Sequence, residues 1–131
     1  MKEELFKAIP GTNERYWISN YGRILSSSFT HNYHKPHFIQ PSSNGRGYLM
    51  FYTHLNGTRK RYNVHRLVAT LFVKNPNPAL FTEVNHIDEN KLNNRADNLE
   101  WCNRSINMRK FWQNKHRLHI RGKAILNTID E

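Results

Sequence analysis

A histidine set among asparagines is the part of this 131-residue sequence best suited to chemistry. His86 follows Asn85 and precedes a polar loop from Asp88 to Asp97 that holds three further asparagines. An ordinary imidazole has a pKa of about 6.5, so a histidine can accept a proton near neutral pH. Amide carbonyls are hard oxygen donors that suit Mg²⁺ or Mn²⁺. Asparagine is also common in turns, so composition alone leaves a reactive site and a plain loop both open.

The spacing of these residues narrows the choice. The run from Val84 to Trp101, continued to Asn107, resembles the HNH homing-endonuclease family. Upstream, Val64 to Pro76 matches the pattern of the same family, and Tyr16 to Ile24 resembles the small nuclease-associated module that often precedes it. The motifs follow the expected order over roughly residues 8–110, which makes the set far more specific than any one of them.

The resemblance implies a ββα-metal finger, in which two strands and a helix hold one divalent cation per active site. In that finger His86 is the general base, Asn98 is the middle asparagine that fixes the loop, and Asn85 and Asn107 are metal ligands. The implied activity is Mg²⁺- or Mn²⁺-dependent hydrolysis of duplex DNA that leaves 3′-hydroxyl and 5′-phosphate ends. The base deprotonates the attacking water, and the cation stabilises the phosphate and the departing oxygen.

Asn85 stands where many relatives carry aspartate. If Asn85 and Asn107 are the only protein ligands, the site has no anionic ligand of its own, although Mg²⁺ usually binds carboxylates and phosphates. We therefore expect the free protein to hold Mg²⁺ weakly and DNA phosphate to complete the site. Asp88 and Asp97 are nearby carboxylates to which the motif assigns no role.

The first half of the chain is expected to be rich in short strands. Strand-forming runs flank Asn20 to Gly22 and again flank Asn56–Gly57, and both patterns predict hairpins. The Ser- and His-rich stretch from Ser26 to His37 is expected to be a loop. Residues 65–72 carry apolar side chains at helical spacing, and the prolines that follow cannot continue a helix.

Strand, loop, strand and helix are expected in the second half, with strands at 83–86 and 99–102 and a helix from about 104 to 115 capped by Asn103. The predicted fold class is α+β. Its expected parts are a β-rich DNA-contacting module (1–63), the nuclease core (64–118) and a basic, polar tail (119–131).

The charge balance predicts a polyanionic partner. Twenty Lys and Arg residues against ten Asp and Glu residues give a net charge of +10. Arg59, Lys60 and Arg61 cluster on the second hairpin, where alternation places Arg59 and Arg61 on one face. Few acidic residues follow Glu100. We expect phosphate contacts from this hairpin and from the C-terminal residues Arg104, Arg109, Lys110, Lys115 and Arg117.

The remaining histidines favour simpler interpretations. His65 opens the first helix and is expected to be structural, with a phosphate contact as the alternative. His31, His34 and His37 recur at every third position, but structural zinc needs four ligands and no fourth is evident nearby. A single cysteine, Cys102, excludes an internal disulfide and is expected to be a small packed residue.

The sequence leaves two other functions open: a non-catalytic DNA-binding accessory protein on a decayed nuclease fold, and a structural RNA-binding protein. It also leaves open a monomer, which would nick DNA, and a two-fold dimer, which would cut both strands. No apolar run approaches membrane-spanning length, and Met1 to Glu4 does not resemble a signal peptide. We expect no membrane partner and a place in the cytoplasm of a bacterial or phage-infected cell. Several relatives continue into a helical DNA-reading module, for which this chain has no room, so recognition is expected from the hairpins and the tail.

Overall fold

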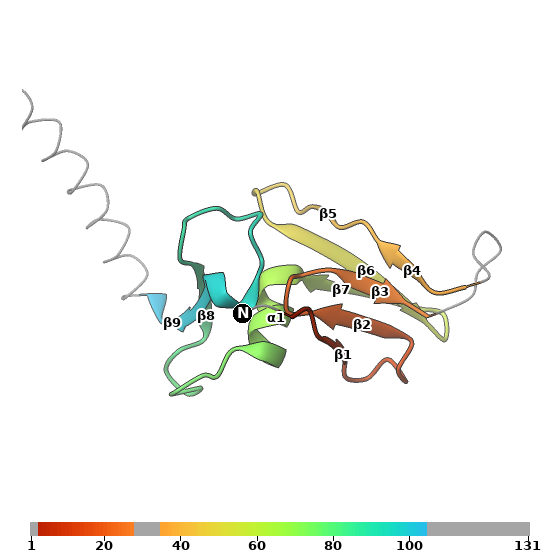
Figure 1. Cartoon of the computed structure of the whole chain (residues 1–131), viewed down its shortest axis with the longest axis horizontal. Helices are drawn as coiled ribbons and strands as arrows, with labels where there is room; N and C mark the ends of the chain where they lie inside the picture. The colour runs from red at the N-terminus through yellow and green to blue at the C-terminus, as the bar shows by residue number, and fades with distance from the viewer. Residues whose placement is uncertain (1–2, 28–34, 105–131) are drawn as a thin grey trace, which may run out of the picture.

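Three antiparallel sheets surround one helix in the computed structural model, which describes residues 3–27 and 35–104 (Figure 1). The first sheet has the order β1-β2-β3-β4 and comprises β1 (Phe6–Ala8), β2 (Tyr16–Ser19), β3 (Ile24–Ser26) and β4 (His37–Ile39). The second, β5-β6-β7, comprises β5 (Ser42–Ser43), β6 (Leu49–Leu55) and β7 (Thr58–Asn63). The third pairs β8 (Glu83–His86) with β9 (Leu99–Cys102). The predicted α+β class is confirmed.

Both predicted hairpins are present. Between β6 and β7, Asn56 and Gly57 have φ values of 51° and 77°, the left-handed conformation that a two-residue hairpin turn requires. β2 and β3 pair around the turn at residues 20–22. The strands β1, β4 and β5, of two or three residues each, were not predicted. β4 begins at His37, the last residue of the stretch expected to be a loop.

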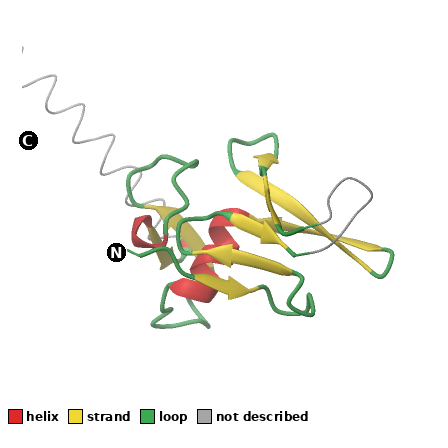
Figure 2. Cartoon of the chain, turned by 45° about the vertical axis from the view of Figure 1, so that its right-hand side comes forward, coloured by secondary structure: helices red, strands yellow, loops and turns green. Residues whose placement is uncertain are grey.

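The helix α1 (Val64–Phe72) lies between the sheets and packs against strands of all three (Figure 2). It confirms the helix predicted at 65–72. Val64, Val68 and Ala69 are completely buried, so its apolar face forms the centre of the molecule. Burial of a large aliphatic side chain stabilises a fold by about 1.5–3 kcal/mol, so this helix contributes much of the free energy that holds the sheets together.

A single hydrophobic core joins the three sheets through α1. Ile18 and Ile24 enter it from the first sheet, Phe51 from the second, and Val84 and Leu99 from the third. Side chains from both sides of the division predicted at residue 63 therefore pack together, while that division itself stays a prediction. Cys102 is 1% exposed, in agreement with a packed role.

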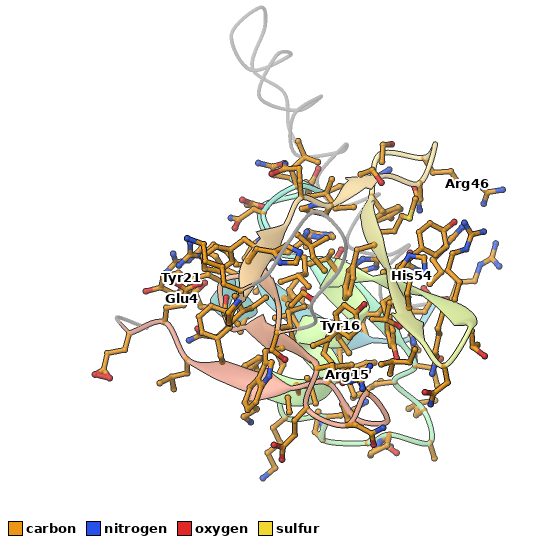
Figure 3. All side chains as sticks on the ribbon, turned by 90° about the vertical axis from the view of Figure 1, so that its right-hand side faces the viewer. Glu4, Arg15, Tyr16, Tyr21, Arg46 and His54 are labelled. Atoms are coloured by element: carbon orange, nitrogen blue, oxygen red, sulfur yellow. The ribbon has the colours of Figure 1, made fainter. Side chains whose placement is uncertain are left out.

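A side-chain contact also ties the first sheet to the second. Tyr16 of β2 points toward His54 of β6, and its hydroxyl accepts a hydrogen bond from the His54 backbone N–H at 3.0 Å (Figure 3). This contact and the core hold the long β6–β7 hairpin against the rest of the protein.

Several predictions lie outside the described residues: most of the helix expected at 104–115, the 119–131 tail, His31 and His34, and the site residues Asn107, Arg109, Lys110, Lys115 and Arg117. Within 3–27 and 35–104, no helix is long and apolar enough to cross a membrane.

Candidate active site

The paired strands β8 and β9 place His86 and Asn85 at the beginning of the polar loop. Register pairs His86 with Leu99 and Asn85 with Glu100. Because side chains alternate along a strand, Val84 and His86 turn inward while Asn85 stays partly exposed. His86 is only 5% exposed, so its ring is anchored by packing with one edge left toward the loop.

The Asn98 side chain makes three hydrogen bonds within the loop between the two strands. Its side-chain oxygen accepts the Asp88 backbone N–H at 3.0 Å, and its amide nitrogen donates to Asp88 Oδ1 at 2.9 Å and to the Asn93 carbonyl at 2.8 Å. The backbone carbonyl of Asn98 accepts the Ile87 N–H at 2.8 Å. Asn98 is 8% exposed, and its partly buried bonds close the loop onto the strand ends.

The two aspartates of the loop are engaged in local contacts. Hydrogen bonds from the Asn93 side chain, the Asn90 backbone and the Asn98 side chain hold the pKa of Asp88 below its usual value. Asp97 lies 3.5 Å from the Arg95 guanidinium. Asp88 thus stabilises the loop that carries the site, a role that its sequence position alone did not reveal.

Asn94 holds the catalytic candidate directly. His86 Nε2 and Asn94 Oδ1 are 2.7 Å apart, and both side chains are buried. An amide oxygen only accepts hydrogen bonds, so in this arrangement Nε2 carries the proton. The other ring nitrogen, Nδ1, is then the one with a free lone pair to accept a proton from water.

The turn between β2 and β3 of the N-terminal sheet packs against Asn94. Gly22 has φ +87°, and a Cβ built there would lie 3.2 Å from Asn94 Cβ, so the turn approaches the loop too closely for a larger residue. Ala96 N–H also donates to the Asn20 carbonyl at 2.8 Å. The turn between β2 and β3 is therefore part of the support of the site, although it lies more than 60 residues upstream.

On its other side His86 meets two more rings. The His65 ring lies 5.2 Å from the His86 ring and stacks on Tyr48 at 4.8 Å. Burial, with the nearby charge of His86 and then of Arg66, lowers the pKa of His65 to about 4, so this ring is neutral at pH 7. Among the described residues His65 Nδ1 has no hydrogen-bond partner, and it does not make the backbone bond expected of a purely structural histidine.

Asn85 faces a carboxylate that sequence reasoning overlooked. Asn85 Nδ2 donates to Glu100 Oε2 at 2.9 Å across the β8–β9 pair. With Nδ2 engaged, Asn85 Oδ1 is the end of the amide that could coordinate a cation, and the bond places a negative charge in direct contact with the expected neutral ligand. An amide oxygen beside a carboxylate is a donor set that suits a hard cation such as Mg²⁺.

The described residues do not complete such a site by themselves. No group of three or more His, Cys, Asp or Glu side chains gathers within 3–27 and 35–104. The second expected ligand, Asn107, lies outside the described residues. The donors in view therefore fit only part of the coordination shell of a cation, and the remaining oxygens would come from outside the described residues.

The basic residues of the hairpin lie where the sequence placed them. Register sets Arg59 opposite His54 and Arg61 opposite Tyr52, so the two arginines share a face of β7. The Arg59 guanidinium covers the Tyr52 ring at 4.2 Å, while Lys60 covers the Tyr62 ring at 5.1 Å. All three are exposed, as is Arg104 after β9. They stay candidates for phosphate contacts.

Comparison with known proteins identifies two parts of the chain. Residues 62–109 match the family model of HNH endonucleases, and residues 4–51 match the NUMOD4 motif. The chain contains an HNH endonuclease domain. Both resemblances inferred from the sequence are thus confirmed, and the β8–loop–β9 unit that carries His86 lies inside the HNH domain.

Relatives of the HNH domain include viral and phage nucleases. The chain is 42% identical over 96 residues to the uncharacterized HNH endonuclease L245 of Acanthamoeba polyphaga mimivirus, covering 73% of this chain and 27% of that protein. It is 43% identical over 88 residues to the SPbeta prophage-derived putative HNH homing endonuclease YosQ of Bacillus subtilis, covering 65% of this chain and 45% of that protein. The chain spans about half or less of the length of these curated relatives.

A solved structure shows the same fold. The HNH homing endonuclease I-HmuI, in a structure that concerns its DNA binding and cleavage, superposes with a TM-score of 0.70 and 29% identity over 85% of this chain and 59% of that chain. In sequence the chain is 33% identical over 107 residues to I-HmuI of Bacillus phage SP01, covering 79% of this chain and 55% of that protein. The similarity includes both the N-terminal sheets and the HNH domain.

For three residues of the site the sequence predicted no role: Tyr48, Asn94 and Glu100. Asn94 belongs to the asparagine-rich loop, but the closure that turns it toward His86 depends on tertiary contacts. Glu100 could have been found, because antiparallel pairing of the two predicted strands sets it opposite Asn85. Tyr48 precedes β6, and only the fold brings it to the histidines.

Proposed function

We propose that this protein is a metal-dependent DNA endonuclease in which His86 is the general base that activates the attacking water. One observation carries the proposal: the contact between His86 Nε2 and Asn94 Oδ1, which orients the ring so that Nδ1 is the nitrogen that can accept a proton. The I-HmuI fold and the HNH match supply independent support.

In the proposed reaction each residue has a distinct task. His86 Nδ1 takes a proton from water as that water attacks the phosphorus, and Asn94 accepts the hydrogen bond of Nε2–H as the ring becomes positive. Asn98 keeps the loop closed, so the ring and the ligand amide hold their separation through the reaction. A bound divalent cation would supply charge stabilisation at the phosphate and at the departing oxygen.

Asn85 and Asn107 would hold the cation, with Glu100 acting through Asn85. A carboxylate that accepts from Nδ2 fixes the orientation of the amide and increases the electron density on Oδ1, which strengthens the carbonyl as a ligand. This changes the expectation from sequence in one respect: the site has an anionic group, although that group contacts the ligand instead of replacing it.

The test of the function is cleavage of supercoiled plasmid with Mg²⁺, with Mn²⁺ and with EDTA. We expect conversion to nicked or linear DNA with either metal and none with EDTA. Nicked product would indicate a monomer that cuts one strand, and linear product would indicate cuts in both strands. DNA binding without cleavage under any metal, on plasmid and on the physiological target alike, would favour the accessory DNA-binding protein instead.

Glu100→Gln is expected to weaken metal binding. We predict about a tenfold loss of Mn²⁺ affinity, because a group that orients a ligand typically contributes 10- to 100-fold. Free Mn²⁺ would be measured by electron paramagnetic resonance in the complex of the His86→Ala protein with duplex DNA, where the strand stays intact. Asn85→Asp added to Glu100→Gln should restore affinity by returning the negative charge to the ligand position.

Glu14→Gln is the control for the loss of one negative charge, because it removes an exposed carboxylate from the N-terminal sheet region. Equal loss of Mn²⁺ affinity in both variants would show that Glu100 acts only through net charge, and would contradict its role through Asn85.

A further inference from the structure

A polar cavity of about 600 Å³ adjoins the proposed active site. It lies between the end of β7, the first turn of α1 and β8, and Tyr48, Asn63, His65 and Glu83 contribute to its walls. His65 belongs to both places, because its ring contacts the His86 ring and also lines the cavity. Whatever occupies the cavity therefore lies one side chain away from the general base.

Two buried polar atoms belong to residues that line this cavity, and neither has a hydrogen-bond partner among the described residues: His65 Nδ1 and Asn63 Oδ1. Buried polar groups are nearly always satisfied, so a pair of orphans in one place indicates a missing ligand or water. His65 is 8% exposed and neutral at pH 7, so it can offer Nδ1–H as a donor. A half-turn of the Asn63 amide offers its NH₂ group in the same way.

The charge around the cavity identifies the ligand class. Three arginines line it, Arg46, Arg61 and Arg66, against one acidic residue, Glu83. Arg46 extends away from the body of the protein and forms the outer rim (Figure 3), while Arg66 also donates to the Thr82 carbonyl at 3.0 Å. An excess of arginines over acidic residues, with two uncharged polar side chains in the wall, suits an anion and disfavours a cation.

We propose that this cavity is a subsite for a backbone phosphate of the DNA, next to the phosphate that is cleaved. His65 and Asn63 bind its oxygens as neutral donors, and the arginines neutralise its charge. The subsite rests on the proposed function only in taking DNA as the ligand. Binding there would hold the DNA strand in register with His86, because His65 contacts this phosphate and also packs against the His86 ring.

The first test is His65→Phe, measured as affinity for duplex DNA in EDTA, where no cleavage takes place. Phenylalanine keeps a ring to stack on Tyr48 but removes Nδ1–H. We expect about a tenfold loss of DNA affinity with an unchanged or raised Tm, because a hydrogen bond to a charged group is lost while an unpaired buried nitrogen disappears. Wild-type DNA affinity in this variant would overturn the proposal. A loss of DNA affinity accompanied by a lower Tm would overturn it as well, because unfolding would then explain the loss.

The second test compares two arginines of β7 that share a face. Arg61 lines the cavity and Arg59 does not. In Arg61→Gln, the slope of log affinity against log salt should fall by about one unit, the value for one lost phosphate contact, with a smaller change in Arg59→Gln. Equal slopes for both variants would mean that β7 contributes only diffuse charge, and would contradict a defined subsite.

Inorganic phosphate alone is the remaining probe. Saturable shifts of the His65 ring resonances that duplex DNA does not displace would assign the cavity to free phosphate, and the DNA assignment would be wrong. Because binding in EDTA needs no catalysis, a protein that cuts no plasmid could still pass these tests, so failure of the subsite and failure of the nuclease proposal are distinguishable.

Discussion

His86→Ala is expected to reduce plasmid cleavage by about 10²- to 10⁴-fold, the range in which general-base catalysis contributes. The alanine cannot accept the proton of the attacking water, while the cation ligands and the basic surfaces are untouched. Duplex DNA should therefore still bind with nearly wild-type affinity. Initial rates of nicking with Mg²⁺, together with a binding isotherm in EDTA, measure both quantities.

Removal of the buried His86 ring also leaves space beside Tyr48 and His65, so two controls separate chemistry from folding. The first is the Tm of the variant. The second is added imidazole, which can enter the vacated space and restore part of the rate with a dependence on imidazole protonation. A variant that cuts DNA at the wild-type rate would remove His86 from the mechanism.

Asn98→Ala is expected to destabilise the protein by about 3 kcal/mol, because its side chain serves three buried or partly buried hydrogen bonds and leaves partners unsatisfied when it is removed. In a domain of this size that corresponds to a fall in Tm of roughly 10 °C. Cleavage should drop as well, because the loop no longer holds Asn94 against His86. Thermal unfolding followed by circular dichroism measures the first effect.

Asn90→Ala is the matched control within the same loop. Asn90 is exposed, and its side chain accepts a single hydrogen bond, from the Leu92 N–H at 3.0 Å. Its loss should cost about 1 kcal/mol or less. If the two alanine variants unfold at the same temperature, Asn98 is an ordinary turn residue and the loop is held by other contacts.

The sequence was most informative where a pattern is local. Asn56–Gly57 predicts its hairpin because few other residue pairs adopt two consecutive left-handed conformations. The apolar spacing of 65–72 predicts α1 because only one face of a helix can be buried. The HNH pattern assigned His86 and Asn98 from fixed spacing, and the structure brings both into the single β8–loop–β9 unit.

Short strands escaped prediction for a physical reason. β1, β4 and β5 have two or three residues each, too few to show an alternating pattern, and each forms through hydrogen bonds to a neighbouring strand. Their cause is tertiary, so no window of local sequence contains it.

By itself the sequence indicated the HNH domain and the module that precedes it, the order of the main elements, the excess of positive charge and the identity of the proposed base. Only the tertiary structure decided which neighbours act on that base: Asn94 on Nε2, braced by Gly22 from the N-terminal sheet, and His65 against the ring. It also decided that Glu100 contacts Asn85 and that His65 borders a cavity with two unpaired atoms. The reason is that spacing along a chain restricts only near neighbours, whereas contacts across a core depend on how three sheets pack on one helix.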